Sequence, residues 1–92
     1  MDDEIVVVPL EDSIDLHTFA PREVPLVLGE YLGACRELGI TEARVIHGKG
    51  RGVLRAGVLS FLEKCDLVQS FFPAPPERGG WGAVIVILKP NK

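Results

Sequence analysis

Two amphipathic helix patterns, each preceded by a short strand-like segment, most constrain the fold of this chain. Apolar side chains recur at steps of three and four over residues 21–38, and the spacing repeats over residues 54–65. Residues 13–17 alternate apolar and polar side chains, and residues 43–47 form a second short, largely apolar segment. Strands and helices that alternate in this order require crossover connections between parallel strands, so the pattern predicts helices packed on a sheet.

The rest of the chain completes a four-stranded sheet. Residues 67–72 predict a third strand, residues 73–82 a loop rich in proline and glycine, and residues 83–89 a fourth strand. The fourth strand is apolar on both faces, which predicts a central or well covered position, and it can pair with the third as a wide hairpin. We therefore expect a two-layer α/β (α+β) sandwich, ordered β-α-β-α-β-β, with two helices on a mixed four-stranded sheet.

A chain of 92 residues is the size of one domain. We place this domain at residues 13–89, after an N-terminal extension at 1–12 and before a short tail at 90–92. Within the extension, the β-branched residues 5–8 can form only a short or edge strand, because Pro9 ends them.

The N-terminus is acidic where a signal peptide is basic, and no segment has the roughly 20 apolar residues of a membrane helix. We therefore expect a cytoplasmic protein without a membrane partner. We expect a monomer or a homodimer. Cys35 and Cys65 lack metal-ligand spacing and fall on apolar helix faces, which favours reduced thiols in the core.

The net charge of −3 argues against coating a polyanion through bulk charge. The charges are unevenly distributed, however. Between Glu42 and Glu63 the chain carries four cations and no acid, while the remainder sums to −7. These cations are Arg44, Lys49, Arg51 and Arg55. The pattern predicts a local basic patch that could contact phosphate.

Both histidines of the chain, His17 and His47, end predicted strands. If these strands are parallel neighbours, both side chains emerge at the carboxyl edge, where open α/β sheets bind ligands. Asp15 lies two residues before His17 and so shares its face, where a carboxylate can orient an imidazole. The three residues resemble an acid-base set, although a histidine that only forms hydrogen bonds remains an alternative for each. A metal site lacks a visible fourth ligand, so no cofactor is predicted and a divalent metal such as Mg²⁺ stays open.

The segment from residue 48 to 55 is typical of a phosphate-binding loop at a helix N-terminus. We expect it to bind through Gly48, Lys49, Gly50, Arg51, Gly52 and Arg55. A dinucleotide fingerprint fits less well because the spacing is GxGxG, and the GK[ST] of a P-loop is missing. A turn required only for tight helix packing remains an alternative. In a later glycine-rich loop, Trp81 could stack on a base or fill the edge of the core.

Together these segments resemble the Smr (small MutS-related) domain. The resemblance rests on residues 14–17, on residues 47–52 with 54–55, and on residues 79–83, and it covers residues 13–89. The fold it implies, similar to the C-terminal domain of translation initiation factor three, has the order of elements given above. Family members occur as stand-alone proteins or appended to MutS-like ATPases and other modules, and we expect the stand-alone short form.

The resemblance implies an endonuclease that nicks DNA or cleaves RNA, with roles in DNA repair and recombination or in RNA quality control. Matched to the family motifs, Asp15 and His17 correspond to the LDxH element tied to cleavage. His47, Gly48 and Gly50 correspond to the HGxG element tied to nucleic-acid binding and activity. One imidazole would then act as general base and the other as general acid, with the cations and helix amides holding the phosphate.

This sequence departs from the family pattern at three positions. Ile14 replaces the usual Leu, Thr18 a frequent Gly, and Val84 a common Thr. The first change is trivial. The other two bear on loop conformation and substrate preference more than on the chemistry, because the ionisable groups remain. The alternative function is a non-catalytic nucleic-acid-binding or ribosome-associated module that uses the same edge. A phosphate-ligand or protein-interaction domain is a third. A domain of this size has limited surface for a long substrate, so a protein partner of unknown identity stays open beside DNA or RNA. The sequence does not choose between DNA and RNA.

Overall fold

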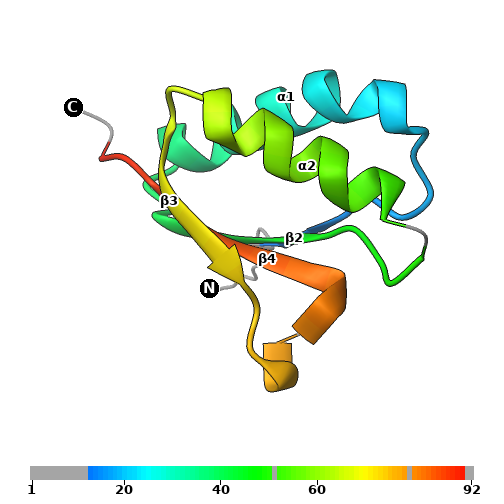
Figure 1. Cartoon of the computed structure of the whole chain (residues 1–92). Helices are drawn as coiled ribbons and strands as arrows, with labels where there is room; N and C mark the ends of the chain where they lie inside the picture. The colour runs from blue at the N-terminus through cyan, green and yellow to red at the C-terminus, as the bar shows by residue number, and fades with distance from the viewer. Residues whose placement is uncertain (1–12, 51, 79, 91–92) are drawn as a thin grey trace, which may run out of the picture.

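The computed structural model describes residues 13–50, 52–78 and 80–90 of the chain. Helices α1 and α2 lie side by side over one face of a four-stranded sheet, as Figure 1 shows. The elements in chain order are β1 (Ser13–Asp15), the 3-10 turn η1 (Pro21–Glu23), α1 (Val24–Glu37), β2 (Glu42–Ile46), α2 (Val53–Lys64), β3 (Val68–Pro73), the 3-10 turns η2 (Pro76–Arg78) and η3 (Gly80–Gly82), and β4 (Ala83–Leu88). The predicted β-α-β-α-β-β order is confirmed.

The strands lie in the order β1-β2-β4-β3. β1 and β2 are parallel neighbours, whereas β4 is antiparallel to both β2 and β3. The sheet is therefore mixed, as predicted, and β3 and β4 pair as the wide hairpin. β4 occupies a central position and all of its residues except Ile87 are buried, which explains why its sequence is apolar on both faces.

The main core lies between the helices and the sheet. Alternate residues of β4, namely Val84, Val86 and Leu88, belong to the cluster that includes Leu28 and Leu32 of α1. On β4, Ala83 and Ile85 join a second, smaller cluster with Ala74, so both faces of this strand are covered. The first cluster also includes Val58 and Leu62, from the predicted apolar face of α2.

Helix α1 starts later than its apolar pattern suggested, and its two prolines explain why. Pro21 opens the 3-10 turn η1, and Pro25 lies in the first turn of α1, where a missing N–H breaks no helical hydrogen bond. Gly39 ends the helix as predicted, with a φ of 82°. Its N–H donates to the Arg36 carbonyl and that of Ile40 to the Cys35 carbonyl, the two bonds of a Schellman motif.

The first two strands end before their histidines, which corrects the predicted boundaries. In β1, the Oδ1 of Asp15 accepts the backbone N–H of His17 at 3.0 Å, and this local bond turns the chain out of the sheet. The N–H of Leu16 still donates to the Ile46 carbonyl at 2.7 Å, so it prolongs the pairing by one residue. β2 ends at Ile46, although the N–H of His47 still donates to the Gly82 carbonyl at 2.8 Å. The bounds of β3 and β4 differ from prediction by one residue only.

Cys35 is buried and Cys65 is half-buried, so the predicted core position holds fully for Cys35 alone. Within the described ranges, neither helix is long and apolar enough to span a membrane. The expected extension at 1–12 with its strand at 5–8, Arg51, Gly79 and residues 91–92 lie outside the described residues.

Candidate active site

Asp15 and His17 form a hydrogen-bonded pair at the carboxyl end of β1. The Nδ1 of His17 lies 2.6 Å from the Oδ1 of Asp15, and the two side chains are 60% and 50% exposed. The ring hydrogen bond, supported by the backbone N–H of His17, holds the pKa of Asp15 below its usual value. An ionised carboxylate can only accept, so Nδ1 carries the proton. In the neutral imidazole, Nε2 is then the unprotonated nitrogen, which can accept a proton.

His47 has a different environment although it lines the same cavity. This cavity, the His17 cavity, has a volume of about 430 Å³ and is lined by His17, His47, Gly48, Lys49, Gly50, Gly52, Val53, Leu54 and Arg55. The structure thus brings both histidines together at the predicted edge. The His47 side chain, however, is only 4% exposed.

The ring of His47 is anchored through one nitrogen. Its Nδ1 donates to the Gly48 carbonyl at 2.8 Å, because a carbonyl can only accept. Its Nε2 is buried without a partner among the described residues. Burial lowers the pKa of His47 and the positive charge of Arg55 lowers it further, while the bond to Gly48 acts in the opposite direction. The neutral imidazole is therefore favoured, and Nε2 does not reach solvent.

The glycine-rich loop between β2 and α2 is held by a residue from the far end of the chain. The carbonyl of Gly82 accepts the N–H groups of His47 and Gly48, at 2.8 and 3.0 Å. Gly48 has a φ of 85°, and a Cβ built on it would lie 3.3 Å from the Cβ of His17. A side chain at position 48 would thus be strained and would press on His17.

Two of the four predicted cations line the site. Lys49 and Arg55 both contribute to the His17 cavity, at the start of α2, where free N–H groups also favour anions. Arg44 does not belong to this patch, which corrects the predicted +4 cluster. In β2 it alternates with the buried Ala43 and Val45, and its guanidinium donates to the carbonyl of Arg78 at 3.1 Å. Arg51 lies outside the described residues.

Trp81 is 73% exposed, so its predicted alternative position at the edge of the core is wrong. The guanidinium of Arg55 lies over its ring, 5.8 Å from the centroid, within the range of a cation-π interaction. A further cavity of about 320 Å³ joins Trp81 and Arg55 to Lys49 and three glycines of the loop. The structure therefore brings Trp81 beside the predicted phosphate-binding loop.

The described residues contain no group of three His, Cys, Asp or Glu side chains arranged to hold an ion. Sequence reasoning missed two features of the site. It gave no role to Gly82, although a glycine in this loop can signal that another backbone segment, here that of Gly48, approaches closely. It also missed an apolar cavity next to Trp81, for which the run Phe71, Phe72 and Pro73 was the only signal.

The fold and the site define a class of small two-layer α/β domains with an Asp-His pair beside a glycine-rich loop at the carboxyl edge of parallel strands. The chain belongs to the Smr domain family, whose model matches residues 14–89. It is 38% identical over 78 residues to Endonuclease MutS2 of Thermus thermophilus, which covers 85% of this chain and 10% of that protein. The Ribosome rescue factor SmrB of Aeromonas hydrophila is 35% identical, covering 87% of this chain and 46% of that protein.

Two solved structures share the fold. The crystal structure of the Smr domain of Thermus thermophilus MutS2 superimposes with a TM-score of 0.81 at 37% identity, covering 85% of this chain and 98% of that one. YdaL, a stand-alone small MutS-related protein from Escherichia coli, also gives 0.81, at 29% identity and 88% and 66% coverage. The chain spans about a tenth of the length of its MutS2 relatives.

Proposed function

We propose that this chain is a nucleic-acid endonuclease whose phosphodiester cleavage site is the His17 cavity. The observation that carries the proposal is the Asp15-His17 pair, with a 2.6 Å bond that fixes the ring beside the glycine-rich loop and leaves Nε2 as the acceptor of the neutral imidazole. An exposed, oriented imidazole is suited to accept a proton from an attacking nucleophile. Membership of the Smr family, with a relative named Endonuclease MutS2, supports the same function.

In the proposed mechanism, His17 acts as general base. Its Nε2 takes the proton of a water molecule, or of the 2′-hydroxyl when the strand is RNA, as that oxygen attacks phosphorus. The bond from phosphorus to the leaving oxygen breaks, and solvent protonates this oxygen. Lys49, Arg55 and the loop amides would balance the negative charge that develops on the phosphate.

His47 would position the site and not transfer protons. Its Nε2 is buried, and its Nδ1 proton is engaged by the Gly48 carbonyl, so neither nitrogen is available to a substrate in this arrangement. Its hydrogen bond instead keeps the loop that carries Gly48 against His17. The prediction that His47 is the second catalytic imidazole therefore stays untested, and the burial of its ring favours a positioning role.

The test is cleavage of labelled single-stranded RNA and of supercoiled plasmid by the purified chain, with and without EDTA. His17→Ala should lose about 10²- to 10⁴-fold in rate, the usual contribution of a general base. Asp15→Asn should lose less, because the amide can still contact the ring. Arg22→Ala, an exposed cation on η1 away from the cavity, is the control and should cleave normally. Wild-type rates for His17→Ala would refute the assignment.

The alternative is a non-catalytic module that binds nucleic acid or the ribosome. It is favoured by the single accessible imidazole, because the paired acid-base mechanism expects two. A relative named Ribosome rescue factor SmrB points in the same direction. Binding with a steep salt dependence but no products from either substrate would select this function over the endonuclease.

A further inference from the structure

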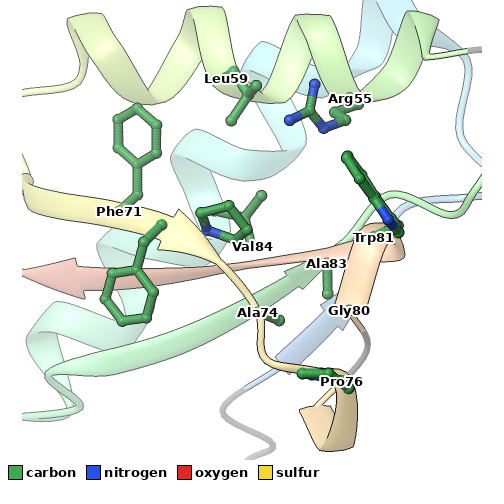
Figure 2. A pocket seen from close by; sticks show the side chains of 11 residues that line it. Arg55, Leu59, Phe71, Ala74, Pro76, Gly80, Trp81, Ala83 and Val84 are labelled. Carbon is green, nitrogen blue, oxygen red and sulfur yellow. The ribbon is translucent and has the colours of Figure 1, made fainter.

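An apolar cavity opens beside Trp81, at the edge of the sheet formed by β3. Its volume of about 530 Å³ falls in the range of roughly 300–1,000 Å³ that small-molecule pockets occupy. The walls come from the first half of α2, the end of β3 and the loop before β4, and include Arg55, Leu59, Phe71, Phe72, Pro76 and Trp81. In Figure 2, Arg55 and Leu59 extend from α2 towards the sheet, and Trp81 stands opposite Arg55. We call this hollow the Trp81 cavity.

The Trp81 cavity adjoins the phosphate-binding loop through shared lining residues. Arg55 lines it and also lines the His17 cavity. The smaller hollow between them is bounded by both Arg55 and Trp81. A ligand that crosses these three hollows would meet the Asp15-His17 pair, then the glycines with Lys49, then flat apolar walls. The cation-π contact of Arg55 with Trp81 lies where the charged surface of the glycine-rich loop meets the apolar wall of the Trp81 cavity.

We propose that the Trp81 cavity receives one unpaired nucleobase of a strand whose phosphate lies at the glycine-rich loop, so that the substrate is single-stranded. This inference rests on the proposed function. A nucleotide combines one anionic phosphate with one flat ring. The phosphate matches the cations and glycines of the first two hollows, and the ring matches the apolar walls of the Trp81 cavity. An apolar peptide would fill the cavity but would leave Lys49 and Arg55 without an anionic partner.

The aromatic and proline walls suit a base because stacking on π-faces tolerates any base. In a duplex both faces of each base are covered by its neighbours, and entry would require the base to leave the helix. Apart from Arg55, no described side chain that lines the cavity is charged, so the cavity favours the uncharged base over the phosphate.

The fluorescence of Trp81 provides a direct test, because it is the only tryptophan of the chain and is largely exposed. The chain is titrated with single-stranded RNA, single-stranded DNA, a duplex of the same sequence and an abasic oligomer with the same number of phosphates. Binding is followed in parallel by anisotropy of labelled oligomers. We expect saturable quenching by both single strands, and none by the duplex or the abasic oligomer, even where these bind through phosphate.

Variants then separate the cavity from general binding. Trp81→Ala should weaken binding of the single strands by about 5- to 150-fold, the loss expected when one stacking contact is removed. It should leave affinity for the abasic oligomer unchanged. Leu26→Ala is the matched control, since Leu26 is 68% exposed on α1 and should affect neither. Phe72→Ala keeps the fluorescent reporter and should weaken quenching by single strands.

The outcomes distinguish this inference from the proposed function. Quenching by single strands without any cleavage would support the base-binding cavity and refute the endonuclease. Suppose instead that the wild type cleaves while Trp81 emission stays unchanged, and that Trp81→Ala keeps the wild-type KM. This result would refute base binding in the Trp81 cavity and leave the endonuclease proposal standing. Equal quenching by the abasic oligomer would also overturn the inference. An absence of quenching by every nucleic acid would also overturn the inference, and an apolar segment of a protein partner would then be the better candidate for binding in the cavity.

Discussion

Replacement of Gly48 by Ala tests whether backbone geometry in the glycine-rich loop sets the position of His17. Gly48 has a φ of 85°, in the left-handed region, which costs a residue with a Cβ about 1–2 kcal/mol. Alanine also reduces the entropy of the unfolded chain, which offsets about 0.4–1 kcal/mol. We therefore expect Gly48→Ala to lower the free energy of unfolding by about 1 kcal/mol.

The added methyl group has a second effect, which is local. It would lie 3.3 Å from the Cβ of His17, closer than the optimum of about 3.5–4.0 Å for two carbon atoms. His17 must shift by a few tenths of an ångström to relieve this contact. Misplacement of a catalytic group by about 1 Å can cost 10²-fold in rate, so we expect a loss of cleavage of several-fold, up to that limit.

Gly39→Ala supplies the matched control. Gly39 has nearly the same φ, 82°, but a Cβ there would meet nothing within 4 Å, and it ends α1 away from the cavity. Urea unfolding should show similar losses of stability for both variants. Cleavage, measured where each variant is fully folded, should fall only for Gly48→Ala. Normal cleavage by Gly48→Ala, or an equal loss in Gly39→Ala, would refute the reasoning.

Three further predictions follow from the core, the buried histidine and the loop. Leu32→Ala should lower the free energy of unfolding by about 2–5 kcal/mol, and Leu38→Ala, at an exposed site, by less than about 0.5 kcal/mol, as measured by urea titration. Burial lowers the pKa of His47 in the folded state, so near and below pH 6.5, the ordinary pKa of histidine, the unfolded chain binds more protons than the folded chain. The free energy of unfolding should therefore fall as the pH drops through 6.5, and it should fall less in His47→Gln, as measured by urea titration at several pH values. Lys49→Ala should reduce the salt slope of nucleic-acid binding by about one, whereas Lys64→Ala, at the opposite end of α2, should leave it unchanged.

Periodicity alone was sufficient to predict the order of strands and helices. The helical repeats and the short strand between them determine which faces are buried, and a strand apolar on both faces has to lie centrally, as β4 does. The stops at Gly39 and after β2 follow from glycine chemistry that acts within a few residues. Such local rules do not depend on the rest of the chain.

The site was predictable only in part. Strand alternation determines which side chains of the site are exposed near β1 and β2, whereas the exposure of the loop residues depends on packing between distant segments. Ala43 and Val45 point towards the helices, and His47 continues their alternation, so its burial was implicit in the sequence. His17 follows the buried Leu16 and so points away from that core. The direction of Arg44 follows from the same alternation. In contrast, the exposure of Trp81 depends on how the loop from η2 to η3 folds back, which no local pattern specifies.

The bonds from His47 and Gly48 to the Gly82 carbonyl have a consequence for the time course of folding. β4 is the last strand along the chain, yet it lies between β2 and β3 and follows directly after Gly82. During synthesis, β1, α1, β2 and α2 emerge before the segment that joins the two halves of the sheet and fixes the loop. A nascent chain would therefore carry His17 and Lys49 for some time without an assembled site. Chemistry that depends on this arrangement would therefore begin only after Gly82 and β4 have been synthesised.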